Sequence, residues 1–145
     1  MSEASHITRR ISQAEADRIC ARHDRLWSSK PGGARAVFAW ADLSGLDLSG
    51  RNLCDADFSG AVLANCNLRG ARLDHATLFG ADLQDCDLRE ASLRRADLRA
   101  ACLRNADLTG ADLFEADLRE GGLAAADPKF GFRRIEAGGQ ARVGD

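Results

Sequence analysis

Residues 81–118 read ADLQDCDLREASLRRADLRAACLRNADLTGADLFEADL, and the period of this stretch decides the fold. Every third residue of each five-residue unit is leucine, and the same register holds between positions 43 and 123, where Phe58 is the one departure. The residue two before each central position is usually Ala, and the residue directly before it is most often Asp. The repeat therefore fills most of the 145-residue chain.

A five-residue period fits neither an α-helix nor a flat strand. In an α-helix, residues five apart differ by about 140° around the axis, so the leucines would cover the whole circumference. In a strand of period two, the odd spacing would send alternate leucines to opposite faces. The leucines share one interior only if the chain turns a corner every five residues. The position two after each centre is often Gly, as at Gly45 and Gly60, and suits a corner because Gly tolerates positive φ.

Triplets such as Ala81-Asp82-Leu83 and Ala106-Asp107-Leu108 make the chain resemble the pentapeptide-repeat family, whose repeat is A-(D/N)-L-x-x. The resemblance implies an all-β solenoid, a right-handed quadrilateral β-helix with about twenty residues in each square coil. Residues twenty apart are then expected to stack, and one interior column is Phe38, Phe58, Leu78, Leu98 and Leu118. Because Phe38 is in register, we expect the β-helix to cover residues 36–125 in about four and a half coils.

Residues 1–35 are predicted to form an N-terminal arm and an α-helical cap on the solenoid. Ser12-x-x-Glu15 is a capping box, which marks a helix start. Apolar side chains then follow helical spacing, and we expect Leu26 and Trp27 to pack on the lower end of the core. An amphipathic helix that binds a membrane or a partner is the alternative.

Residues 126–145 are predicted to form a C-terminal cap and a flexible tail, the tail from Ala137 onward. Pro128 occupies the next central position and cannot donate to a ladder, so coiling is expected to stop there. Phe130, Phe132 and Ile135 either fold over the end of the core or make a homodimer contact. The sequence leaves both alternatives open.

The five cysteines are an odd number and include no C-x-x-C pair, which favours free thiols in a reducing cytoplasm. Cys66 and Cys86 are expected to be inward neighbours on adjacent coils, and Cys54 and Cys102 to face outward. No Cys or His pair has metal-ligand spacing, so we expect neither a metal nor a cofactor. No apolar run is long enough for a membrane span, and no secretory signal is visible.

The outward positions supply the candidate binding residues, and none is expected to be catalytic. Aspartates recur on two opposite faces, where a solvated, repetitive wall does not separate carboxylate pKa values as acid–base catalysis requires. Arginines that follow their central leucines ring one coil, and we expect them to pair with aspartates across neighbouring coils or to form a belt for an acidic partner. Outward aromatic side chains are suited to anchoring an interface. The candidates are Asp47, Asp87, Asp107, Asp57, Asp97, Asp117, Arg89, Arg94, Arg99, Arg104, Phe79 and Phe114.

Two functions compete on these features. The first is a non-enzymatic protein–protein interaction module or scaffold, with a protein partner that the sequence does not identify. The second comes from the resemblance, since some family members mimic DNA, bind DNA gyrase or related topoisomerases and modulate sensitivity to quinolones or toxins. Residues 41–125 carry a net charge of −6, which suits a mimic of DNA, but arginine within the aspartate columns reduces their negative electrostatic field. Residues 1–40 carry +3 without interleaved aromatics, so direct nucleic-acid binding is not expected.

Overall fold

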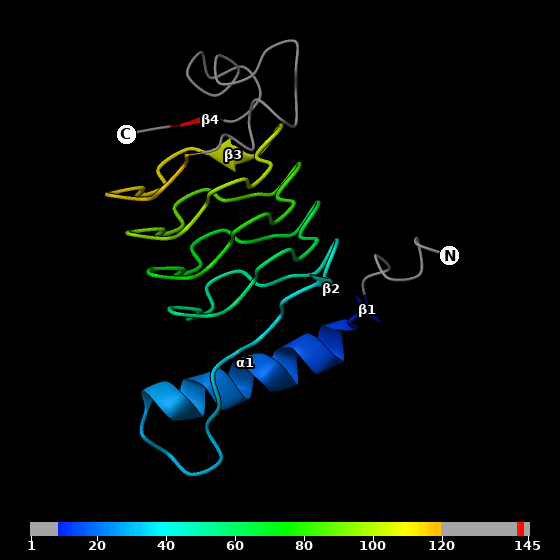
Figure 1. The fold of residues 1–145 in the computed structure, drawn as a ribbon. Helices are drawn as coiled ribbons and strands as arrows, with labels where there is room; N and C mark the ends of the chain where they lie inside the picture. Colours follow the sequence, from blue (N-terminus) through cyan, green and yellow to red (C-terminus); the bar gives the residue numbers. More distant parts are fainter. Residues whose placement is uncertain (1–8, 120–141, 144–145) are drawn as a thin grey trace.

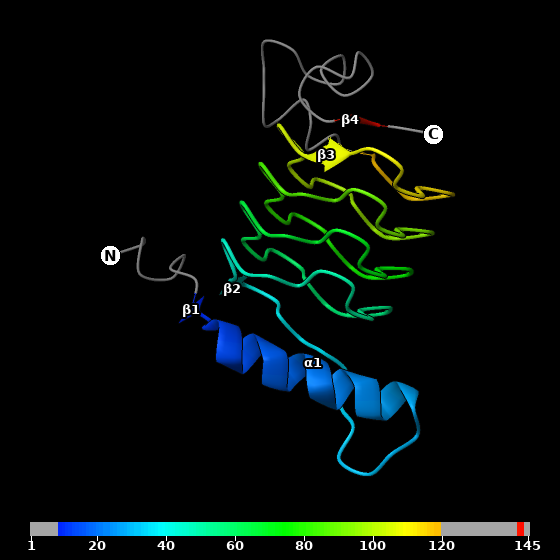
Figure 2. The ribbon, with the colours of Figure 1, turned by 180° about the vertical axis from the view of Figure 1, so that it is seen from behind.

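The structure, a computed structural model, describes residues 9–119 and 142–143. Its elements are β1 (Arg9–Arg10), α1 (Gln13–Trp27), β2 (Ala41–Asp42), β3 (Asp107–Leu108) and β4 (Arg142–Val143). Between β2 and β3 the chain winds as a stack of coils, and α1 lies across one end of that stack in both views (Figures 1 and 2). Among the described residues, no helix combines the length and the hydropathy needed to cross a lipid bilayer.

The coils stack with a register of twenty residues, as the sequence predicts. Parallel bridges join Asp57 to Thr77, Thr77 to Asp97 and Asp97 to Asp117, and equivalent bridges run up the other faces. The N–H of Leu83 donates to the carbonyl of Cys102 at 2.8 Å, which places the central leucines of successive coils one above the other. The chain is therefore a solenoid, and its strands are short because the chain turns after every bridge.

In the unit centred on Phe58, every backbone N–H has an acceptor. The N–H groups of Phe58 and Gly60 donate to carbonyls of the coil above at 2.7 and 2.8 Å, and that of Asp57 donates to the coil below at 3.0 Å. The N–H of Ala56 closes the preceding corner on the carbonyl of Leu53 at 3.1 Å. The remaining N–H, that of Ser59, donates to the carboxylate of Asp57 at 2.9 Å. The coil thus leaves no backbone donor of this unit without a bond.

The core is the column of central side chains together with the small residues two before them. Phe38 and Phe58 stack in it with their ring centroids 5.1 Å apart. The corners have positive φ, with 61° at His75 and 69° at Gly70, as the sequence predicts for that position. Cys66 and Cys86 are buried and free, as expected.

Cys54 is buried, with 4% of its surface exposed, so the prediction that it faces outward is wrong. The reason is α1, which covers this part of the first coil. His23 of α1 lies with its Nε2 atom 2.8 Å from the carbonyl oxygen of Cys54. Cys102, by contrast, is half-buried, since α1 lies at the other end of the stack.

The start of α1 follows the predicted cap, because Ser12 accepts the N–H of Glu15 at 3.1 Å. Three residues of the helix are buried, namely Ala16, Cys20 and His23. Leu26 and Trp27 are 46% and 48% exposed, so the prediction that they pack on the core is wrong. His23 is the last buried residue of the helix, and Leu26 and Trp27 line a hollow against the first coil in place of packing on its core.

Two short strands extend the ladder at its ends. β1 pairs in parallel with β2, and the N–H of Ile11 donates to the carbonyl of Asp42 at 3.0 Å. Ile11 is 1% exposed and takes the place of a central residue below Leu43. At the other end β4 pairs in parallel with β3.

β4 lies within the region predicted as a flexible tail from Ala137 onward, and the rest of that region is outside the described residues. The predictions for Pro128, Phe130, Phe132 and Ile135 lie outside the described residues.

Candidate interaction surface

The predicted aspartate columns exist, and their carboxylates take part in the turns. Each aspartate accepts the N–H of the residue two further on at 2.9 to 3.1 Å. That N–H is the one donor of the pentapeptide that no backbone carbonyl accepts. The two columns are Asp47, Asp87 and Asp107, and Asp57, Asp97 and Asp117.

The outward-facing sides of the coils form the walls of the stack. Several arginines of these walls bind the aspartate of their own turn. The guanidinium of Arg89 donates to both oxygens of Asp87 at 2.8 and 2.7 Å, and Arg99 binds Asp97 in the same way. These bidentate bonds lie within one turn, whereas pairing across coils was predicted; Arg99 also makes the predicted kind of pair, with its Nε 4.0 Å from Asp117 of the next coil. The two side chains of each pair flank a buried leucine, so both point outward on the same side of the strand and lie within reach of each other.

Other arginines do reach the neighbouring coil, as predicted. Arg94 binds Asp112 at 2.8 Å and Arg95 binds Glu115 at 2.6 Å. Arg104 donates to Gln84 at 2.6 Å. The four predicted arginines therefore all bind side chains of the walls themselves.

These bonds stabilise the charged form of the carboxylates. The hydrogen bond from Arg89 lowers the pKa of Asp87, and that from Arg99 lowers the pKa of Asp97. The hydrogen bond from Arg119 lowers the pKa of Asp117 to about 2. The aspartates stay ionised near neutral pH, but adjacent guanidinium groups offset part of their field.

Phe79 and Phe114 are 45% and 47% exposed, as predicted for outward aromatic residues. Wall arginines lie over both rings. The guanidinium carbon of Arg99 is 5.4 Å from the centroid of Phe79, and that of Arg94 is 4.6 Å from the centroid of Phe114. Part of each aromatic face is thus occupied by a neighbouring cation.

Two exposed apolar residues of the first coil were missed from the sequence. Val37 is 54% exposed and Trp40 is 66% exposed. The ring of Trp40 lies over Gly60, where a Cβ atom would come within 2.2 Å of the ring. Both residues occupy outward positions of the pentapeptide centred on Phe38, so their exposure could have been predicted from the repeat register.

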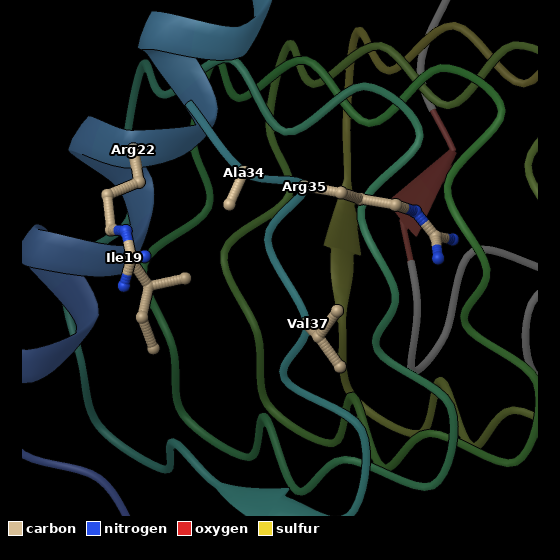
Figure 3. A pocket seen from close by; sticks show the side chains of 5 residues that line it. All are labelled: Ile19, Arg22, Ala34, Arg35 and Val37. Atoms are coloured by element: carbon tan, nitrogen blue, oxygen red, sulfur yellow. The ribbon is translucent and has the colours of Figure 1, made fainter. Parts of the chain in front are cut away.

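Two hollows lie where α1 meets the first coil. The smaller, of about 180 Å³, is lined by Ile19, Arg22, Ala34, Arg35 and Val37. Ile19 and Arg22 extend from the helix on one side of it, and the other three residues lie on the facing segment (Figure 3).

The larger hollow, of about 310 Å³, is lined by His23, Leu26, Trp27, Arg35 and Asp55. Arg35 borders both hollows. We call the exposed residues Arg22, Leu26, Trp27, Arg35 and Val37 the junction surface.

The cations around the junction surface differ from those of the predicted belt. Arg35 donates from Nε to the backbone carbonyl of Asp55 at 2.6 Å, which leaves its charge without a carboxylate. Within residues 9–119 and 142–143, no ion pair involves Arg18, Arg22, Arg25, Lys30 or Arg35. Positive charge is therefore available to a partner here.

His23, which lines the larger hollow, is held by hydrogen bonds, and the buried thiols of α1 and the core are protonated. His23 is fully buried, its Nδ1 accepts the N–H of Ala36 at 3.0 Å, and its Nε2 lies within donating distance of Cys54. Burial raises the pKa of Cys20 and of Cys66 to about 11, so these thiols stay protonated at neutral pH. In the described part of the chain, no group of three or more His, Cys, Asp or Glu side chains is placed to hold a metal ion.

The repeat is also recognised by comparison with protein families. The model described as "Pentapeptide repeats" matches residues 34–70, 56–95 and 91–121, which is more than half of the chain. The chain belongs to the pentapeptide-repeat family. Comparison with curated proteins gives no match.

Solved pentapeptide-repeat structures share the fold. The protein Rfr23 of the cyanobacterium Cyanothece is 36% identical, with a TM-score of 0.58, over 59% of this chain and 58% of that one. HetL of the cyanobacterium Nostoc, described as involved in the regulation of heterocyst differentiation, is 33% identical, with a TM-score of 0.55, over 60% of this chain and 44% of that one. This pentapeptide-repeat chain thus spans less than two thirds of either relative.

QnrB1, described as a plasmid-mediated fluoroquinolone resistance protein, is more distant. It is 17% identical with a TM-score of 0.27, over 61% of this chain and 65% of that one. A likeness at this level carries no argument about the function of the present pentapeptide-repeat protein.

Proposed function

We propose that this pentapeptide-repeat protein is a non-enzymatic protein–protein interaction module. In this proposal the stack of coils is the scaffold and the junction surface contacts the partner. One observation carries it: exposed apolar side chains and cations without ion pairs gather at the junction, whereas Arg89, Arg94 and Arg99 bind carboxylates of the walls. Protein interfaces favour large apolar anchors and arginine, and they need side chains that are free to bond.

Further elements of the proposal rest on the predicted domain organisation. The scaffold is a right-handed quadrilateral β-helix of about four and a half coils over residues 36–125, and residues 1–35 cap its lower end. The caps are supported by Ile11, Ala16 and Cys20, which join the hydrophobic core. The free thiols support a location in the reducing cytoplasm. A homodimer contact through the C-terminal end stays a prediction.

Capture experiments with matched variants test the proposal. The junction pair Leu26→Ser and Val37→Ser replaces two exposed apolar residues, and the control pair Phe79→Ser and Phe114→Ser makes the same change on the walls at similar exposure. We expect the wild type and the wall pair to retain the same protein partner from a lysate, and the junction pair to lose it. Loss in the wall pair alone, or no partner for the wild type, would overturn the proposal.

The topoisomerase hypothesis is tested alongside in a gyrase supercoiling assay, with and without a quinolone. The arginine bonds to Asp87 and Asp97 argue against mimicry, because they offset the charge that a phosphate-like column needs. Inhibition or protection that survives in the junction pair and disappears with Asp57→Asn and Asp97→Asn would favour mimicry over the proposal.

A further inference from the structure

We infer that the junction surface binds an acidic segment of a protein partner, one that carries large apolar side chains between its carboxylates. This inference rests on the proposed function and adds the chemistry of the partner. It follows from three features of the surface, namely its charge, its exposed apolar side chains and the size of its hollows.

The charge of the surface selects an acidic partner. Arg22 and Arg35 line the smaller hollow, and Arg18, Arg25 and Lys30 belong to the same region of α1 and the turn that follows it. None of these five forms an ion pair with the described residues, so carboxylates of a partner do not have to displace internal ones. Arginine also binds carboxylates in a bidentate manner, which adds orientation to attraction.

The exposed apolar residues select a partner with apolar anchors. Leu26 and Trp27 line the larger hollow and Val37 lines the smaller one, each with about half of its surface in contact with solvent. Because Arg35 borders both hollows, an apolar side chain in either of them lies next to a cation. The pattern fits a segment in which acidic and apolar residues are interspersed.

The sizes of the hollows favour side chains over a whole small molecule. Pockets for drug-sized ligands have volumes of roughly 300–1,000 Å³. The larger hollow, of about 310 Å³, is at the lower limit, and the smaller, of about 180 Å³, is below it. Two separate hollows that share one arginine, Arg35, suit successive anchors of one peptide better than a flat lipid surface.

The two tryptophans make binding directly measurable. The chain has two Trp and no Tyr, so its intrinsic fluorescence comes from Trp27 and Trp40. Trp27 lines the larger hollow and is 48% exposed, and Trp40 lies on the first coil and is 66% exposed. A partner that covers Trp27 removes water from its ring and shifts its emission to shorter wavelength, and the variant Trp40→Phe isolates this signal.

The test uses the full chain with three synthetic peptides of equal length. One combines Glu with Leu and Phe, the second has Lys in place of Glu, and the third has Ser in place of Leu and Phe. We expect the first peptide to shift the Trp27 emission and to bind at least about tenfold more tightly than the other two. Raising the salt concentration well above physiological levels is expected to weaken the binding of the first peptide severalfold, because exposed charges are screened.

Matched charge variants locate the site. Arg22→Glu reverses a junction charge, and Arg69→Glu makes the same change at an exposed wall arginine of the opposite face. We expect Arg22→Glu to weaken the binding of the acidic peptide about tenfold or more and Arg69→Glu to change its affinity less than twofold. The thermal stability of both variants is expected to equal that of the wild type.

The other outcomes overturn the inference in distinguishable ways. Equal binding of the Lys peptide would show that the acidic chemistry is wrong, and equal loss in both arginine variants would show that the junction surface is not the binding site. An emission shift with anionic lipid vesicles and with none of the peptides would assign the surface to a membrane. If no peptide binds while the junction pair still loses the captured partner, the proposed function stands and the partner chemistry is wrong, whereas failure of that capture overturns the proposed function as well.

Discussion

At the scale of single residues, the aspartate that often precedes a central leucine is explained by the backbone. Four N–H groups of a pentapeptide bond to carbonyls, and where Asp or Asn is present its side-chain oxygen accepts the fifth, as Asp57 does for the N–H of Ser59. Asn67 does the same for the N–H of Arg69 at 3.1 Å without a charge. The preference for Asp or Asn is therefore explained by stabilisation of the turn, and it is no evidence for a charged binding face.

This explanation predicts that Asp57→Asn is close to neutral and that Asp57→Ala is destabilising. Asn keeps the acceptor for the N–H of Ser59, whereas Ala leaves that donor without a bond, which costs about 1 kcal/mol. Urea unfolding of the two variants measures the difference. Equal destabilisation by both would show that charge, and not the turn, determines the preference.

The bonds to arginine predict a loss of stability in acid. The hydrogen bonds from Arg89, Arg99 and Arg119 lower the pKa values of Asp87, Asp97 and Asp117 from their usual 3.8, the last to about 2. The unfolded chain then binds more protons than the folded one in this range. The contribution of these groups is present above the unfolded pKa and is lost as pH falls through the folded pKa.

We therefore expect the urea midpoint to fall as pH decreases from about 4 toward about 2. The double variant Asp87→Asn and Asp97→Asn removes two of the titrating groups and is expected to have a shallower decrease. A pH profile of equal slope in the variant would contradict this assignment.

At the scale of elements, the seating of α1 depends on a close backbone approach. The segment after the helix returns beneath it, and the N–H of Ala34 donates to the carbonyl of Arg22 at 3.0 Å. A Cβ atom on Gly33 would lie 2.4 Å from the backbone nitrogen of Leu26, a contact that neither backbone can relieve without moving. Glycine at this position therefore allows the junction surface to form.

Gly33→Ala is expected to destabilise the protein by about 2 kcal/mol or more, because the strain falls on two backbones at once. Gly70→Ala is the control: its φ is +69°, and a Cβ atom there would meet nothing within 4 Å. The cost at Gly70 is expected to be about 1 kcal/mol, the usual penalty of positive φ. Thermal unfolding of both variants compares them, and equal effects would show that the approach to Leu26 does not matter.

At the scale of the whole molecule, the five-residue register predicts which deletions the stack tolerates. Removal of residues 71–90, one complete coil, leaves Leu93 five positions after Leu68 and so keeps all the central side chains inward. Removal of residues 71–88 takes away fewer residues but shifts the register by two and turns polar side chains into the core. We expect the first deletion to keep a cooperative unfolding transition and the second to lose it, as monitored by circular dichroism. Similar behaviour of the two would contradict the register.

The sequence was sufficient for the coils because they repeat, and insufficient where contacts do not repeat. Periodicity predicted the stacking of Phe38 on Phe58 and the exposure of Phe79. The burial of Cys54 and the exposure of Trp27 depend on where one helix ends relative to the first coil, and no spacing in the chain encodes that position. The junction surface was missed for the same reason, since α1 and the first coil contribute it jointly.

The placement of Ile11 beneath Leu43 also bears on the order in which this protein takes shape during synthesis. Residues 9–11 leave the ribosome before the segment that they pair with, so they have no template until β2 has been made. Higher coils can be added one at a time as they emerge, each upon a finished neighbour. The lowest layer is the exception, because residues 9–11 are translated before the segment on which they pack.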